Sequence, residues 1–200
     1  MSATLTQEIA IAAAQLVVED GMEYAAARQK AARKLAGRSI KPGQMPRNEE
    51  IEDEVRAYLS IFCADTQPTE LRALRELAGR WMDRLAEHRP HLAGAVWRGT
   101  ATRRSAVLLD LYCDDPKSTE IDLINQGIDF DVGGDGDADT GSGYVLTLGA
   151  RSPELGERVT LHLVLHDLDD LRGALKPDAR GRSWRGDRAA LQRALAQDPA

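Results

Sequence analysis

The chain has 200 residues, of which 42% are hydrophobic and 29% are charged, and its formal net charge is −6. This composition suffices to bury a core, and no segment approaches the roughly 18 uninterrupted apolar residues of a membrane span. Residues 1–8 lack the features of a signal peptide, and two cysteines exclude a disulfide framework. We therefore expect a cytoplasmic protein without a membrane partner, and the negative charge argues against nucleic acid as a general ligand.

The first 90 residues have the apolar spacing of amphipathic helices. Apolar residues recur three and four positions apart, and Gly21 follows the first such segment where a C-terminal cap is expected. Pro46 suits the first turn of a helix, and an apolar stripe runs from Leu71 to Leu85. Four helices are predicted, at residues 5–19, 23–36, 46–62 and 70–87.

After Pro90 the pattern changes to short apolar runs that are typical of strands. Strands are predicted at residues 91–97, 106–113, 128–132, 144–150 and 158–166. Helices are predicted at residues 116–126 and 187–197, and a helical turn at residues 169–175. The sequence therefore predicts an α+β fold in which a helical region, 1–90, packs on a mixed β-sheet region, 91–200, as one compact unit.

The segment between the first two predicted strands carries the residues with the clearest chemistry. Gly99 and Thr100 follow one strand, and Asp110 lies in the next. The turn between them holds Arg103, Arg104 and Ser105. A glycine lets backbone N–H groups approach a phosphate, a hydroxyl donates beside it, and a carboxylate on the next strand holds Mg²⁺. This pattern predicts binding of a nucleotide or a phosphorylated small molecule.

The arrangement around Gly99 resembles the nucleotidyltransferase superfamily. More closely, the chain is similar to bacterial proteins described only as nucleotidyltransferase-like, some of which carry a muramate–alanine ligase label. The motifs behind this closer resemblance lie at residues 19–24, 46–52, 89–102 and 114–120. The resemblance implies a nucleotidyltransferase-type mixed sheet, and a Gly-Gly or Gly-Ser motif followed by a carboxylate-x-carboxylate pair that binds Mg²⁺.

The expected carboxylate pair is incomplete in this chain. When Gly99 and Thr100 are taken as the first motif, Asp110 is the first carboxylate and Tyr112 replaces the second. In the other register, Ala106 and Leu108 fill the pair, and both are apolar. A single carboxylate cannot hold two Mg²⁺ ions against a triphosphate. The sequence therefore predicts a catalytically degenerate protein, a pseudoenzyme, that binds its ligand without transferring a nucleotide.

Two alternatives remain open. In one, the chain is an active, Mg²⁺-dependent nucleotidyltransferase whose acids are rearranged, drawn from Asp110, Asp114, Asp115 and Glu120. In that case Asp110 is a catalytic residue and a metal ligand. In the other, the chain is a non-enzymatic interaction module whose helical region contacts a protein partner.

Strand alternation predicts which side chains share a face of the sheet. Asp110 and Tyr112 lie on one face of their strand, and Thr160, His162 and His166 lie on one face of the last strand. If the two faces meet, Asp110, Tyr112, Thr160 and His162 line a ligand-binding cleft. A second group of cations, which suits phosphate oxygens, lies near the C-terminus and comprises Arg180, Arg182, Arg185 and Arg188.

Overall fold

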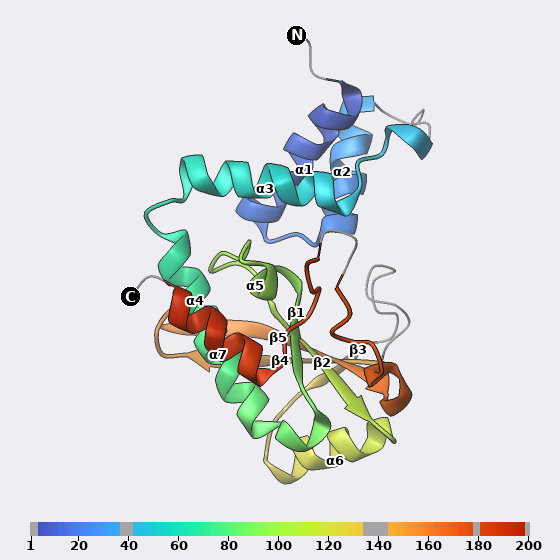
Figure 1. The fold of residues 1–200 in the computed structure, drawn as a ribbon, viewed down its shortest axis with the longest axis vertical. Helices are drawn as coiled ribbons and strands as arrows, with labels where there is room; N and C mark the ends of the chain where they lie inside the picture. Colours follow the sequence, from blue (N-terminus) through green and yellow to red (C-terminus); the bar gives the residue numbers. More distant parts are fainter. Residues whose placement is uncertain (1–3, 37–41, 134–143, 178–180, 199–200) are drawn as a thin grey trace. The chain divides into compact units, whose positions relative to one another are not determined.

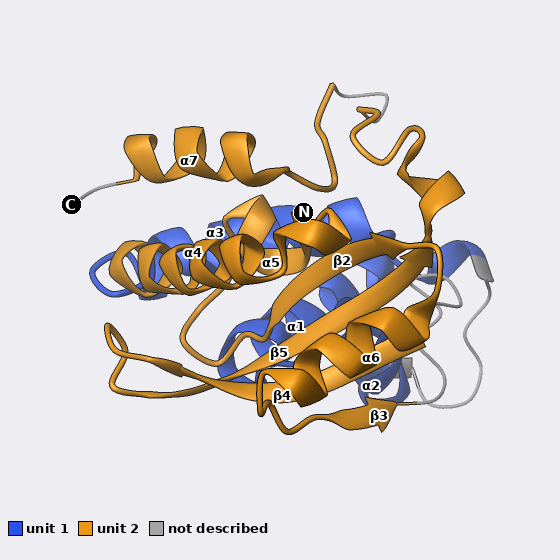
Figure 2. Cartoon of the chain, turned by 90° about the horizontal axis from the view of Figure 1, so that it is seen from below, with its two compact units in different colours: residues 1–67 blue, residues 68–200 orange. Residues whose placement is uncertain are grey.

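The computed structural model describes residues 4–36, 42–133, 144–177 and 181–198, so Arg180 lies outside the described residues. In these ranges, helices α1 to α7 and a five-stranded mixed sheet form the secondary structure, which confirms the predicted α+β class. The chain divides into two compact units, residues 1–67 and 68–200 (Figure 2). The change in composition at residue 90 therefore lies inside the second unit.

The first unit consists of α1 (Leu5–Asp20), α2 (Tyr24–Ala36), the 3₁₀ turn η1 (Pro42–Gln44) and α3 (Asn48–Phe62) (Figure 1). The Thr4 hydroxyl accepts a hydrogen bond from the N–H of Gln7 at the start of α1, and Gly21, with φ 68°, ends this helix. Many of the buried residues are alanines, which let the helix backbones approach closely. The core of this unit includes Ile9, Ala13, Val17, Ala27, Ala31, Ile51 and Val55.

The second unit begins within the first turn of α4 (Gln67–Arg84) and continues with the turn η2 (Ala86–His88). The sheet strands are β1 (His91–Ala93), β2 (Val107–Cys113), β3 (Asp131–Gly133), β4 (Tyr144–Ser152) and β5 (Glu157–Asp167). The remaining elements are α5 (Gly94–Arg98), α6 (Pro116–Asn125), η3 (Leu168–Leu171) and α7 (Arg188–Gln197). The strand order is β1-β2-β5-β4-β3, in which β2 and β5 are parallel and the other pairs are antiparallel.

One face of this sheet forms the core of the second unit. Leu109 and Leu111 of β2 pair with Leu163 and Leu165 of β5, and these four side chains are buried. The apolar stripe of α4 covers them, as its sequence predicted, and Leu123 of α6 belongs to the same cluster. The opposite face carries Asp110, Tyr112, His162 and His166, so the predicted meeting of the two polar faces is confirmed.

The strand predicted at residues 91–97 is wrong beyond Ala93. β1 ends there, because Gly94 adopts φ 66° and begins the five-residue helix α5. The buried Val96 and the large Trp97 make this segment resemble an apolar strand in the sequence. β1 and β2 nevertheless lie side by side, with His91 opposite Asp110.

Candidate functional site

The Gly99 turn is the end of a helix rather than an open loop. Gly99, with φ 79°, caps α5, and the N–H groups of Gly99 and Thr100 both donate to the carbonyl oxygen of Ala95. Thr100 is buried. The two backbone donors predicted to receive a phosphate therefore satisfy a carbonyl of α5 instead.

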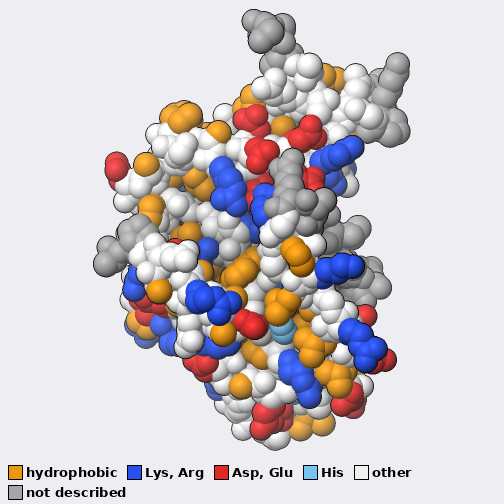
Figure 3. All heavy atoms as spheres, in the orientation of Figure 1, with side chains coloured by type: hydrophobic (Ala, Val, Ile, Leu, Met, Phe, Trp, Pro, Cys, Tyr) orange, Lys and Arg blue, Asp and Glu red, His pale blue; other side chains and the backbone are white. Residues whose placement is uncertain are grey.

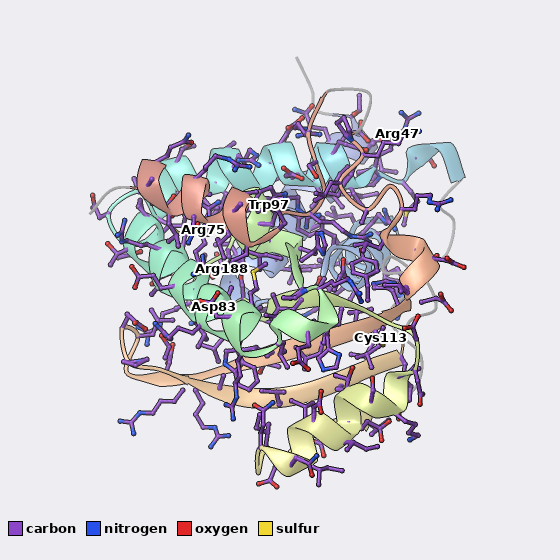
Figure 4. The ribbon with its side chains drawn as sticks, turned by 60° about the horizontal axis from the view of Figure 1, so that its bottom comes forward. Arg47, Arg75, Asp83, Trp97, Cys113 and Arg188 are labelled. Carbon is purple, nitrogen blue, oxygen red and sulfur yellow. The ribbon has the colours of Figure 1, made fainter. Side chains whose placement is uncertain are left out.

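A buried guanidinium closes the end of α5. Arg75 of α4 donates from Nε to the carbonyl oxygen of Val96 and from Nη2 to that of Trp97, both at 3.2 Å. Its Nη1 lies 2.6 Å from Oδ1 of Asp198 in a buried ion pair. Figure 4 shows Arg75 and Trp97 close together beside α7. The surroundings of Gly99 are therefore packed with protein groups.

Arg103, Arg104 and Ser105 lie in the turn before β2, away from Asp110. The Arg103 guanidinium makes two hydrogen bonds to Glu157, at 3.2 and 3.0 Å, and Glu157 raises the Arg103 pKa. The Ser105 hydroxyl accepts a hydrogen bond from the N–H of Thr102, and Arg104 is exposed in the same turn. Arg103 is thus charge-compensated, and three residues of β2, or ~10 Å, separate the beginning of the strand from Asp110.

Asp110 lies at the centre of a polar cluster on the face of the sheet opposite the leucine core. Its side chain is buried, and Oδ1 accepts a hydrogen bond from Nε2 of His166 at 3.0 Å. Oδ2 lies 2.6 Å from Nε of Arg185, an ion pair whose N–H is not aligned as a hydrogen bond. Nη1 of Arg185 donates to the Tyr112 hydroxyl at 3.0 Å. Asp110 is therefore a carboxylate held between a guanidinium and an imidazole.

Aromatic rings complete this group, which we call the Asp110 cluster: Asp110, Tyr112, His166, His91 and Arg185. The Tyr112 ring stacks on His166 with centroids 5.3 Å apart, and the His91 ring meets Tyr112 edge-on at 5.2 Å. Burial raises the pKa of Tyr112 to about 12, so its hydroxyl stays protonated at neutral pH. The cluster therefore combines a carboxyl group, a guanidinium and two imidazole rings.

His162 shares this face with Asp110 but has a different partner. It lies opposite Leu108, and its Nδ1 is 3.0 Å from the Thr147 hydroxyl of β4. Burial lowers the His162 pKa, which favours the neutral imidazole. Thr160 is exposed opposite Gly149. Two of the four residues predicted to line a cleft, Asp110 and Tyr112, thus belong to the cluster.

Two acids of the alternative rearranged site, Asp115 and Glu120, have partners in α6 and β4. Asp115 accepts a hydrogen bond from the N–H of Lys117 at the start of α6, and Glu120 is bound by Lys117 and the Tyr144 hydroxyl. Lys117 lowers the Glu120 pKa. Within the part of the chain that the structure describes, no group of three or more His, Cys, Asp or Glu side chains is arranged to hold a metal ion. These residues do not fit a Mg²⁺ site.

Sequence reasoning missed the partners of Asp110. Strand alternation placed His166 on the correct face, and Arg185 belongs to the arginine group near the C-terminus. His91 comes from the part of the first predicted strand that was correct. Nothing local connects these residues, because the strand pairing and the segment before α7 bring them together.

No family model, curated protein or solved structure matches the chain. The nucleotidyltransferase resemblance therefore stays a prediction. None of the helices within the described ranges is long and apolar enough to cross a membrane.

Proposed function

We propose that this protein is a nucleotidyltransferase-like binding protein that takes up a phosphorylated ligand without a metal ion and does not transfer nucleotides. The observation that carries the proposal is the pairing of both Asp110 oxygens with Arg185 and His166. In a Mg²⁺-dependent site those oxygens face the metal. In this protein the Arg185 guanidinium lies against Asp110, in the place that a metal ion would take beside a metal-binding carboxylate.

The end of β1 supports the loss of transfer chemistry. Gly94, rather than Gly99, follows the first strand and begins the short helix, and a Cβ at Gly94 would lie 3.4 Å from the Cβ of Leu108. If the superfamily signature is aligned so that it begins at Gly94, Gly94 and Ala95 occupy the glycine motif. Ala106 and Leu108 then occupy the two positions of the carboxylate pair. Both positions are apolar, so this register leaves no carboxylate there to hold Mg²⁺ against a triphosphate.

Arg185 is the residue best suited to receive a phosphate. Its side chain is 30% exposed, whereas that of Asp110 is almost fully buried. A guanidinium presents several N–H donors in one plane, which match the oxygens of a phosphate group. His166 contacts the other oxygen of Asp110, so an imidazole lies near this guanidinium. We expect the Arg185 guanidinium to bind a phosphate group while it remains in contact with Asp110.

Isothermal titration calorimetry with nucleoside triphosphates, in Mg²⁺ and in EDTA, tests this function. Wild-type protein should bind equally well in both. Asp110→Asn should bind about fivefold more tightly, or ~1 kcal/mol, because Arg185 then loses its competing carboxylate. Arg185→Gln should weaken binding, whereas Arg193→Gln, which removes an exposed arginine of α7, should not.

Two outcomes would contradict the proposal. Mg²⁺-dependent transfer of label from an α-labelled nucleotide, lost in Asp110→Asn, would identify an active enzyme. Absence of binding by the wild-type protein would instead favour the non-enzymatic interaction module. The same substitution at Asp110 thus has opposite effects under the two ligand-binding hypotheses.

A further inference from the structure

Helix α6 and the edge strand β3 expose three large apolar side chains. Ile121 and Ile124 of α6 are 55% and 62% exposed, and Val132 of β3 is 51% exposed. Figure 3 shows hydrophobic and acidic side chains together at the lower end of the second unit, where α6 lies. We call residues 114–132 the α6–β3 surface. Exposed apolar groups that are surrounded by polar ones typically mark an interaction site.

The strand pairing places these side chains on the same side of the sheet. Val132 lies opposite Leu146 of β4, so it points to the face that Leu146 and Tyr144 share. The Tyr144 hydroxyl donates to Glu120 of α6 at 2.7 Å, which places α6 over that face. Ile124 follows Glu120 by one helical turn. Val132 and helix α6 therefore lie on the same side of the sheet.

The charges of the α6–β3 surface have one predominant sign. Residues 114–132 hold one basic residue, Lys117, whose ammonium group is paired with Glu120. Asp129 and Asp131 are exposed on either side of Phe130. The six acids of this segment are Asp114, Asp115, Glu120, Asp122, Asp129 and Asp131. Glu120 is paired with Lys117 and Asp122 lies 2.8 Å from Nε2 of His88, so the remaining acids leave the segment with an excess of negative charge.

We propose that the α6–β3 surface docks a basic amphipathic α-helix of another protein. An excess of negative charge repels the phosphates of nucleic acids and the headgroups of anionic membranes, but it attracts lysine and arginine side chains. Ile121 and Ile124 are three positions apart and form a ridge along α6, which a second helix accommodates in the groove between its own apolar side chains. This surface shares none of its residues with the Asp110 cluster.

A synthetic helix provides the probe for this surface. The peptide carries leucine at positions i, i+3, i+4 and i+7 and lysine elsewhere, and a control peptide has the same composition with leucine and lysine in alternation. In NMR titrations of the full-length ¹⁵N-labelled protein, we expect the first peptide to shift amides of residues 114–132 and the control peptide to bind at least tenfold more weakly.

Substitutions of exposed residues distinguish specific docking of the peptide from its non-specific hydrophobic or electrostatic binding. Ile121→Ser combined with Ile124→Ser should lower the affinity at least tenfold, whereas Leu175→Ser, at another exposed apolar side chain of this unit, should leave it unchanged. Asp129→Asn combined with Asp131→Asn should reduce the salt dependence of binding, whereas Glu8→Gln should not.

The proposal is overturned if both peptides bind alike, if the shifts spread over the chain, or if Leu175→Ser is as damaging as the isoleucine changes. Shifts of the same amides that depend on protein concentration without peptide would assign the surface to a second copy of the chain, and would also overturn it.

Discussion

At the scale of single residues, Gly186 has no room for a side chain. A Cβ at this position would overlap the six-membered ring of Trp97. The Trp97 indole is fixed by a hydrogen bond from Nε1 to the carbonyl oxygen of Ser183, and the N–H and carbonyl of Gly186 both bond to Leu92. Gly186→Ala should therefore lower the free energy of unfolding by about 1–3 kcal/mol, measured by urea denaturation.

Gly43 provides the matched control for this change. Nothing lies within 4 Å of a Cβ built there, and its φ is not in the left-handed region. Gly43→Ala should change the free energy of unfolding by less than ~0.5 kcal/mol. Equal losses in the two variants would show that Trp97 does not restrict this position. Because Gly186 follows Arg185, the first variant should also weaken phosphate binding.

The residues of the site show where sequence reasoning succeeds and where it ends. Asp110 was identified as the carboxylate on the strand that follows Gly99 and Thr100, and strand alternation correctly placed it on the same face as His166. Arg185 lies far away in the chain, and its contact with Asp110 depends on the route of residues 181–187. No local periodicity encodes that route, so the charge that compensates Asp110 was not predictable.

At the scale of elements, α7 is fastened to α4 by two ion pairs of different burial. Asp198 pairs with Arg75 in a buried setting, whereas Arg188 pairs with the exposed Asp83, as Figure 4 shows. Asp198→Ala should cost about 3 kcal/mol, because it leaves the Arg75 charge buried without its carboxylate. The measurement is thermal unfolding together with hydrogen exchange of the α7 amides, which should exchange faster.

Asp83→Ala is the corresponding control for the exposed pair. Arg188 lowers the Asp83 pKa, but solvent screens this interaction, so the variant should lose at most ~1 kcal/mol. If the two variants were equally destabilised, the buried pair would not be the main attachment of α7. Replacing Arg75 by Met together with Asp198→Ala should recover part of the loss, because no buried charge then remains.

Elements with a long repeating pattern were predictable from the sequence. The periodicity of α1 and α4, and the cap and proline at the start of α6, indicate these helices because each signal has a local physical cause. α5 was not predictable in this way. Its five residues are too few to show a helical period, and the packing of Val96 and Trp97 determines its conformation.

At the scale of the whole molecule, each unit has its own apolar core, and the Asp110 cluster lies entirely within the second. Through Tyr112, this cluster makes the free energy of unfolding depend on pH. Burial disfavours the Tyr112 phenolate, and its pKa rises from 10.0 to about 12 in the folded chain. As the pH increases through this window, the unfolded chain loses its proton first, so unfolding becomes more favourable.

Alkaline denaturation therefore tests the environment of the Asp110 cluster. The stability that Tyr112 contributes is complete below pH 10.0 and is lost as the pH approaches about 12, a loss of about 2–3 kcal/mol. Urea denaturation between these limits should show this slope in the wild-type protein and a shallower one in Tyr112→Phe. Tyr144→Phe is the control, because the Tyr144 pKa is raised chiefly by its hydrogen bond to Glu120 at the surface. An unchanged slope in Tyr112→Phe would mean that water reaches the Tyr112 hydroxyl, and that the cluster is more open than its burial indicates.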